Sequence, residues 1–206
     1  GRTVLFVSHN MPMIQKLTQK CLLMDHGTIG EFGETEPIIE KYLSFDFENE
    51  VREYVADDIG DKTKFKRIRL LGTDGKPKSK FFMNDPIIIE IEISVPGKIQ
   101  NLHIGMDIVS HSGTRVAAAA TWMQNTSVSI ARSGTWKLKL VFPNPRLGPG
   151  KYYTVFGLYH LPRQVHDLVK QILYFDVEPR DILGTGHLPT GLGGQTLTWF
   201  DFSFEG

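Results

Sequence analysis

The chain has 206 residues, of which 41% are hydrophobic, and its 23 Lys and Arg residues balance 23 Asp and Glu residues. A net charge of zero argues against nucleic acid as the main partner, because phosphate backbones are bound by an excess of basic residues. One cysteine, Cys21, excludes an internal disulfide, and no apolar run approaches the roughly 20 residues of a membrane-spanning helix. We therefore expect a soluble, cytoplasmic protein with one large or two small cores.

The first 44 residues alternate between strand-like and helix-like segments. "TVLFVSHNM" (Thr3–Met11) contains a continuous apolar run, which is typical of a strand covered on both faces. Asn10 is a suitable cap for a helix that follows, and "CLLMDHG" predicts a second buried strand that ends in a turn. "TIGEFGE" predicts a glycine-rich connection, and "TEPIIEKYL" predicts a last helix with Thr35 as its cap. This order indicates the end of an α/β domain.

The pattern changes after residue 44. The segment 45–64 is charged and without a clear period, so we interpret it as a linker with at most one short strand or helical turn. From Phe65 onward, short alternating segments are separated by Ser-Gly, Pro-Asn-Pro and Pro-Gly turns, which predicts a mainly β domain over residues 65–206. About eight strands favour a β-sandwich of immunoglobulin-like or jelly-roll type. The candidates are "FKRIRLL", "PIIIEIEISV", "LHIGMDIV", "TRVAAAATW", "TWKLKLVF", "KYYTVFGLY", "ILYFDVE" and "TLTWFDFSFE".

The N-terminal segment resembles the end of the nucleotide-binding domain of ABC transporters. "GRTVLFVSHNM" is similar to the family's strand that delivers the switch-loop histidine, and "CLLMDHGTIGEFG" is similar to its closing strand and turn. His9 matches the switch histidine, whose imidazole in the family approaches the γ-phosphate of ATP. The resemblance implies that residues 1–44 are a remnant of an ATPase domain. We expect Val4–Val7 to exchange its amides quickly, because this strand has lost its sheet neighbours.

We do not expect this chain to hydrolyse ATP, and His9 is therefore not predicted to be catalytic here. No GxxxxGK[ST] phosphate loop is present, so ATP and Mg²⁺ belong to the full-length subunit that the resemblance implies. "GLGGQ" (Gly191–Gln195) resembles the ABC signature motif, but it follows His9 and leads into a strand, so we interpret it as a turn. The histidines lack metal-ligand spacing and no G-x-S-x-G motif occurs, so the sequence predicts neither a metal site nor a nucleophilic serine.

An ATPase tail followed by a sandwich is similar to the ATP-binding subunit of polysaccharide exporters, which move O-antigen or teichoic-acid chains. "FFMNDPIIIEIEISV", "LHIGMDIVSHSGTRV", "LGPGKYYTVFGLY" and "YFDVE" carry this resemblance. It implies a sandwich that recognises undecaprenyl-linked O-antigen, often at its non-reducing end, and couples recognition to export. It also implies a membrane permease as partner, a place at the cytoplasmic face of the bacterial inner membrane, and a homodimer with the C-terminal strand as a candidate contact.

Sugars bind to flat aromatic faces and short polar side chains, so we searched the outward positions of the predicted strands for such residues. Alternation in "KYYTVFGLY" and "LHIGMDIV" sends one set of residues into the core and the other outward. "AAAATW" supplies small side chains that suit the floor of a groove. If these strands are neighbours, one concave face carries the predicted carbohydrate-binding residues Tyr153, Tyr159, His103, Asp107, Trp122 and Gln124.

Other interpretations stay open at this point. Trp122, like Trp136 and Trp199, also fits a sandwich core, and Arg115 is either a phosphate ligand or an ordinary exposed arginine. The whole domain is alternatively a module that binds protein rather than sugar, a teichoic-acid exporter module, or a hydrolase or transferase with Ser, His and Asp in its active site.

Overall fold

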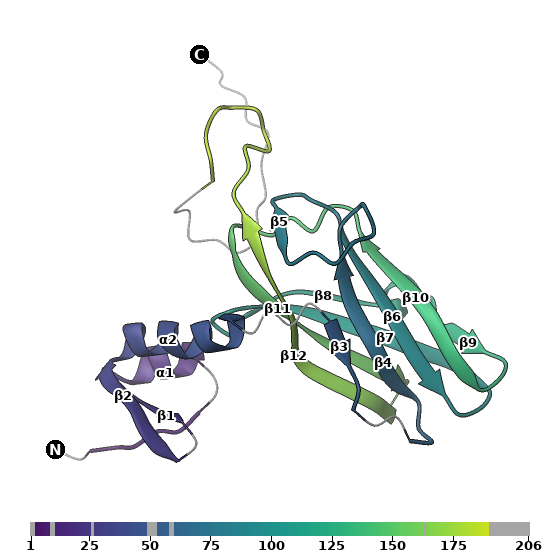
Figure 1. Ribbon diagram of the computed structural model, residues 1–206, viewed down its shortest axis with the longest axis horizontal. Helices are drawn as coiled ribbons and strands as arrows, with labels where there is room; N and C mark the ends of the chain where they lie inside the picture. The colour runs from purple at the N-terminus through teal and green to yellow at the C-terminus, as the bar shows by residue number, and fades with distance from the viewer. Residues whose placement is uncertain are drawn as a thin grey trace.

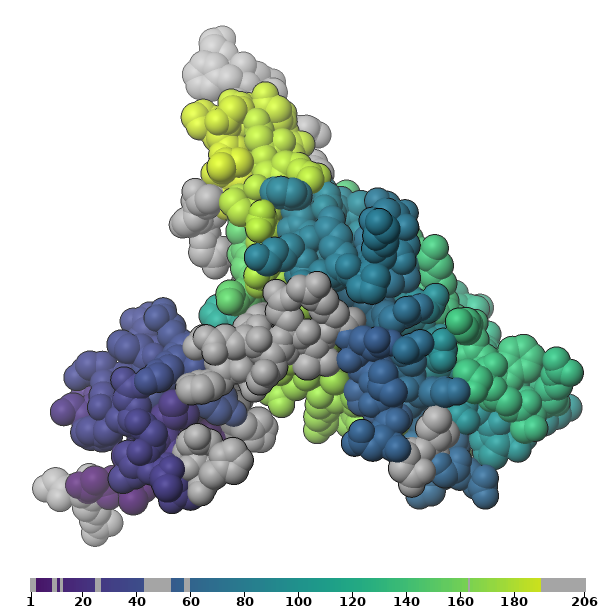
Figure 2. Space-filling model, viewed as in Figure 1, coloured from purple at the N-terminus to yellow at the C-terminus, as the bar shows by residue number. Residues whose placement is uncertain are grey.

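The computed structural model describes residues 3–8, 11–25, 27–48, 53–57, 60–162 and 164–189. It shows a small N-terminal α/β unit and a larger β-sandwich (Figure 1). In the space-filling view the N-terminal unit forms a lobe of its own beside the sandwich (Figure 2). Within the described ranges, no helix combines the length and the hydropathy that a membrane crossing requires.

The N-terminal unit consists of two helices around a β-hairpin. Its elements are α1 (Met11–Leu17), β1 (Lys20–Asp25), β2 (Thr28–Glu34) and α2 (Thr35–Glu48). The two strands pair antiparallel. Thr35, which begins α2 as predicted, is buried, and its hydroxyl donates to the Thr18 carbonyl at 3.0 Å. This bond fixes the start of α2 against the end of α1.

Three predictions for the N-terminal unit are wrong. The strand expected at "CLLMDHG" is present as β1, but it is not buried, because Leu22 and Met24 are 47% and 53% exposed. Residues 3–8 form no strand, and Val4, Leu5 and Val7 are 81%, 93% and 96% exposed. A strand needs a neighbour for its backbone groups, and no described strand pairs with this segment. "TIGEFGE" is not a connection but strand β2, because a turn at Gly27 (φ 84°) brings it back along β1. His9, which was matched to the switch histidine, lies outside the described residues.

The sandwich contains ten strands within the described residues, in two sheets. The four-stranded sheet has the order β10-β6-β4-β3, and the six-stranded sheet has the order β5-β12-β11-β7-β8 with β9 also paired to β7. The elements are β3 (Glu53–Val55), β4 (Lys64–Leu71), β5 (Lys80–Phe82), β6 (Ile87–Val95), β7 (Ile99–Ser110), β8 (Arg115–Ala120), the 3₁₀ helix η1 (Thr121–Gln124), β9 (Val128–Ile130), β10 (Gly134–Phe142), β11 (Gly150–His160) and β12 (Gln164–Glu178).

This arrangement confirms the mainly β sandwich. Strands β4, β6 and β10 lie in one sheet in the order of strands A, B and E of the immunoglobulin fold, and β7, β11 and β12 lie in the other in the order of C, F and G. The immunoglobulin-like topology is therefore the one observed. Seven of the eight expected strands are present and β3, β5 and β9 are short additions, while the eighth, "TLTWFDFSFE", lies outside the described residues together with Gly191–Gln195 and Trp199.

The predicted division into 1–44, 45–64 and 65–206 stays a prediction. Helix α2 continues to Glu48, past the expected end of the first unit. Strand β3 lies inside the expected linker and pairs with β4, so that segment includes the one short strand that was allowed for.

The core lies between the two sheets. On β6 the alternating isoleucines Ile87, Ile89, Ile91 and Ile93 are at most 2% exposed, which confirms the predicted buried face. The opposite face of β6 carries ion pairs with its neighbours, including Lys137 Nζ to Glu92 Oε1 at 3.2 Å. Cross-strand pairs of opposite charge cover the outer face of the four-stranded sheet, namely Glu53–Arg67, Arg69–Glu90 and Glu92–Lys137. Charged side chains therefore cover this outer face, whereas the predicted site residues lie on β7, β11 and η1, at the six-stranded sheet.

Candidate functional site

The strand neighbours that the predicted site requires are present in the six-stranded sheet. Strand β11 pairs with β7, and β7 pairs with β8. In the β11–β7 register Tyr159 is opposite His103, and Gly157 is opposite Gly105. Residues directly opposite each other in an antiparallel pair point to the same face. The alternation predicted from the sequence is confirmed, because Tyr152 and its inner-face neighbours are buried while Tyr159 and His103 lie on the outer face.

Three of the six predicted residues form a group that we call the aromatic cluster: His103, Trp122 and Tyr159. The Trp122 and Tyr159 ring centroids are 5.4 Å apart with an interplanar angle of 89°. The His103 and Trp122 rings are 6.0 Å apart at 82°. Edge-to-face pairs of this kind hold rings in place. Trp122 is 38% exposed, so it belongs to the surface and not to the sandwich core.

Two opposed glycines form the floor of the aromatic cluster. A Cβ atom built on Gly157 would lie 2.1 Å from Tyr159 Oη, and one built on Gly105 would lie 3.0 Å from Trp122 Cη2 and 3.1 Å from Tyr159 Cε2. The tyrosine ring therefore lies directly against the backbone of β11. Next to this floor, Ala120 of β8 is opposite Gly105, which continues the surface of small residues that the sequence predicted.

Thr121 joins the aromatic cluster to β7, and sequence reasoning missed it. Its Oγ1 accepts the Ile104 N–H at 3.1 Å and lies 3.2 Å from His103 Nδ1. Thr121 begins η1, which carries Trp122, so this contact sets where the indole lies. The only sequence signal is a hydroxyl residue directly before the tryptophan.

Asp107 lies one step further along β7, beside the aromatic cluster. Its Oδ2 is 3.5 Å from Arg115 Nη1, and the arginine side chain is 67% exposed. Burial raises the pKa of the Tyr159 hydroxyl, and the Asp107 carboxylate raises it further. Asp107 lies two residues after Gly105 on the same face of β7 and opposite Val155 of β11, so it presents a carboxylate beside the aromatic cluster.

The other two predicted residues lie apart from the aromatic cluster. Tyr153 is opposite Val109, and its ring contacts Tyr174 at 5.7 Å. It is six residues from Tyr159 on one strand, which places it about 20 Å away at roughly 3.3 Å per residue. Gln124 is exposed at the end of η1, two residues after Trp122. The structure therefore places four of the six residues side by side, namely His103, Asp107, Trp122 and Tyr159. Gln124 lies at the rim of this group, and Tyr153 lies at the far end of the same face.

Comparison with known protein families identifies the family of the sandwich. The family model of the Wzt C-terminal domain matches residues 61–191, more than half of the chain. The chain belongs to the Wzt C-terminal domain family. The matched range of this Wzt C-terminal domain includes strands β4 to β12 and all six predicted carbohydrate-binding residues.

Individual relatives are more distant. The teichoic acids export ATP-binding protein TagH of Listeria innocua serovar 6a is 38% identical over 45 residues, which is 22% of this chain and 13% of that protein. The chain thus corresponds to a small part of this curated relative. A crystal structure of the C-terminal domain of Wzt matches 71% of this chain and 87% of its own, with 12% identity and a TM-score of 0.48. A Niemann-Pick type C2 protein from the Japanese carpenter ant matches 61% of this chain and all of its own, with 10% identity and a TM-score of 0.42.

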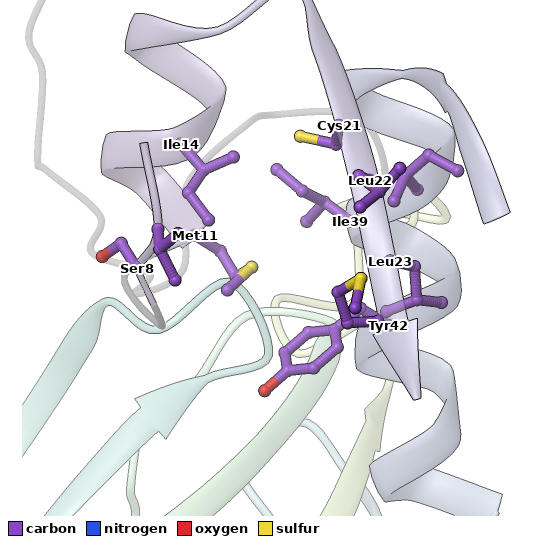
Figure 3. Close-up of a pocket in the computed structure, with 11 residues that line it drawn as sticks. Ser8, Met11, Ile14, Cys21, Leu22, Leu23, Ile39 and Tyr42 are labelled. Carbon is purple, nitrogen blue, oxygen red and sulfur yellow. The ribbon is translucent and has the colours of Figure 1, made fainter. Parts of the chain in front are cut away.

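A cavity of about 470 Å³ lies outside the Wzt C-terminal domain, in the N-terminal unit. In Figure 3 Met11 and Ile14 of α1 point toward Cys21 of β1 and Ile39 of α2, and Leu23 also lines the cavity. The lining is mostly apolar, with Ser8 and Tyr42 as its hydroxyl-bearing residues, and it includes none of the predicted site residues. Sugar hydroxyls need several polar partners, so this cavity is a poor site for a glycan.

Metal ligands do not gather in the part of the chain that the structure describes. Among residues 3–8, 11–25, 27–48, 53–57, 60–162 and 164–189, no three His, Cys, Asp or Glu side chains are placed to hold one ion. His160 and His166 come near each other, with ring centroids 6.3 Å apart, but this pair has no third ligand among those residues. The chemistry available at the aromatic cluster is therefore stacking, hydrogen bonding and charge.

Proposed function

We propose that this chain is the C-terminal part of the ATP-binding subunit of an ABC polysaccharide exporter, and that its sandwich binds the exported glycan without catalysis. Membership of the Wzt C-terminal domain family supports this proposal. So does the partial match to a relative that is named a teichoic acids export ATP-binding protein. In this proposal the whole subunit binds ATP and Mg²⁺, works with a membrane permease at the cytoplasmic face of the membrane, and forms a homodimer.

The observation that carries glycan binding is the aromatic cluster on its glycine floor. An exposed tryptophan and a half-buried tyrosine, held edge to face, form an apolar platform on which the C–H face of a pyranose ring can stack against one of the two ring faces. His103 and Asp107 lie at the margin, where they can hydrogen-bond hydroxyl groups. Binding sites commonly combine a mostly apolar surface with a few placed polar groups. Glycan recognition would therefore use both the ring surfaces of the aromatic cluster and the polar side chains beside them.

The glycan that we propose first is an undecaprenyl-linked O-antigen, recognised at its non-reducing end. Teichoic acid is the second candidate, because the curated relative is named for its export. Teichoic acids carry phosphate groups, and Arg115, whose side chain is 67% exposed and pairs with Asp107, is a cation that could bind them. The two candidates differ in charge, so the salt dependence of binding separates them.

A tryptophan fluorescence titration of the purified chain with O-antigen polysaccharides and teichoic acids tests the proposal. Trp122→Phe is the test variant and Trp136→Phe the matched control, because Trp136 lies on β10 of the other sheet and packs against the core. We expect Trp122→Phe to abolish the ligand-induced change in fluorescence and to weaken binding about tenfold, while Trp136→Phe keeps both. Equal binding by both variants, or binding of no saccharide at all, would contradict the proposal.

A further inference from the structure

Thr121 makes two contacts with β7 that together indicate which ring nitrogen of a neutral His103 carries the hydrogen. Its Oγ1 lies 3.1 Å from the Ile104 nitrogen and 3.2 Å from His103 Nδ1. A backbone N–H is always a donor, so the threonine oxygen accepts the bond from Ile104. The hydroxyl still has one proton to donate, and His103 Nδ1 is the acceptor beside it.

The direction of this second bond decides the imidazole tautomer. A neutral imidazole carries a single proton, and a ring nitrogen that accepts a hydrogen bond is the one without it. With Nδ1 accepting from Thr121, the proton lies on Nε2. The opposite tautomer would make Thr121 Oγ1 accept both bonds, and the hydroxyl would lose its donor bond within the protein. The geometry therefore favours an imidazole whose Nε2–H is free to donate.

The same threonine positions the tryptophan of the aromatic cluster. Trp122 follows Thr121 directly in η1, and its ring lies edge to face with His103 on one side and Tyr159 on the other. A short 3₁₀ helix has few hydrogen bonds of its own, so an anchor at its first residue restricts where it lies. The Thr121 hydroxyl thus positions both His103, which can hydrogen-bond a sugar, and Trp122, on which a sugar can stack.

We propose that Thr121 is a positioning residue that holds His103 as an Nε2–H donor beside Trp122, and that His103 thereby selects sugars with an acceptor oxygen next to the face that stacks on the indole. This inference rests on the proposed function, since it names what the glycan must present. A sugar that stacks equally well but lacks that oxygen leaves the donor without a partner. Leaving a desolvated donor without a partner reduces the binding free energy by more than the net contribution of the hydrogen bond, because the donor has lost its water as well.

Nuclear magnetic resonance of the full chain tests the positioning without any ligand. The ¹⁵N chemical shifts of His103 distinguish the two tautomers, and we expect the Nε2–H form in the wild type and in Thr121→Ser. Thr121→Val keeps the shape of the side chain but removes the hydroxyl, so it should show a mixture of tautomers. Thr126→Val, at an exposed threonine after η1, is the control and should not change the His103 signals.

Calorimetric titration tests the selection, with methyl glycosides of mannose, galactose, glucose and rhamnose and their monodeoxy forms as probes. We expect Thr121→Val to raise Kd about fivefold and Thr121→Ser to restore it. His103→Gln, whose amide nitrogen reaches roughly the Nε2 position, should stay within about threefold of the wild type, while His103→Asn should lose about tenfold. One monodeoxy form of each bound sugar should bind wild type and His103→Asn equally weakly.

The outcomes separate this inference from the proposed function. An Nδ1–H tautomer in the wild type, or an unchanged Kd in Thr121→Val for a sugar that the wild type binds, overturns the inference and leaves glycan binding intact. An Nε2–H tautomer with no binding of any probe or polysaccharide overturns the proposed function, and the role of His103 in selection falls with it. The predicted tautomer together with the predicted ranking of variants supports both.

Discussion

Gly157→Ala is the substitution that should separate binding from folding most clearly. An alanine Cβ would lie 2.1 Å from Tyr159 Oη and 2.3 Å from its Cζ, far inside the roughly 3.5–4.0 Å at which carbon atoms make favourable contact. Gly157 is not among the residues with positive φ, so the backbone accepts alanine. The tyrosine ring is therefore the group that must move, and it moves off the floor of the aromatic cluster.

The effect on stability should be small because two terms oppose each other. Losing the edge-to-face pair of Tyr159 with Trp122 costs about 0.5–1.5 kcal/mol. Replacing a glycine by alanine at a compatible position stabilises by about 0.4–1 kcal/mol through the unfolded chain. We expect a net change within about 1 kcal/mol in the free energy of unfolding, measured by urea denaturation. The variant should fold normally.

The effect on binding should be large by comparison. If the tyrosine ring covers on the order of 50 Å² of apolar sugar surface, its loss costs about 1.3 kcal/mol at 25 cal/mol per Å². That corresponds to a roughly tenfold higher Kd in calorimetry with an oligosaccharide that the wild type binds. Gly105→Ala, where the contacts are 3.0 and 3.1 Å, should lose only about threefold. Gly97→Ala, with nothing within 4 Å, is the control, and an unchanged Kd in Gly157→Ala would refute the role of the platform.

Three further predictions concern the fold. Burial raises the pKa of Tyr152 to about 12, above its value in the unfolded chain, so the contribution of Tyr152 to the free energy of unfolding should be constant below pH 10 and fall between pH 10 and 12. Tyr152→Phe should reduce the fall in stability over this range in urea denaturation, and the remainder belongs to groups such as Tyr54 and Tyr159, whose pKa values burial also raises. Through loss of the 2.8 Å bond to Gly148, the substitution should also cost about 1 kcal/mol at neutral pH. Asp167→Ala should lower the free energy of unfolding by about 1–3 kcal/mol in the same assay, because the carboxylate accepts the Phe65 N–H at 2.9 Å. Lys170→Ala is the control, and equal stability of the two variants would contradict a stabilising role of this hydrogen bond. Amides of Val4–Val7 should exchange within seconds in mass-spectrometric exchange, and slow exchange there would contradict the exposed, unpaired segment.

The sandwich was predictable because alternation fixes the face of each strand. Side chains alternate between the two faces of a strand, so one residue known to be buried assigns all the others to a face. The apolar residues of β7 thus place His103 on the outer face, and the Pro-Gly turn before β11 places Tyr159 there. The hairpin strand β2 was not predictable in the same way, because two of its seven residues are glycines. The segment Val4–Val7 shows the reverse error. Its sequence predicts a strand, but it has no described strand beside it and has no regular secondary structure.

The candidate site was predictable in part. Alternation assigns residues to a face but does not say how far apart they lie along it, which is why Tyr153 was grouped with residues about 20 Å away. Whether Trp122 belongs to the core or the surface depends on η1, whose turn toward β7 comes from the hydrogen bonds of Thr121. Short polar contacts of this kind leave no period in a sequence, so only the structure reveals them.

Mapping of a bound glycan by amide chemical shifts tests the central claim most directly. We predict that an O-antigen or teichoic-acid oligosaccharide shifts the amides of His103–Asp107, Ala118–Trp122 and Gly157–Tyr159, with the outer face of the four-stranded sheet unchanged. Shifts confined to that other sheet or to the N-terminal unit, or no shifts with either polysaccharide, would contradict it.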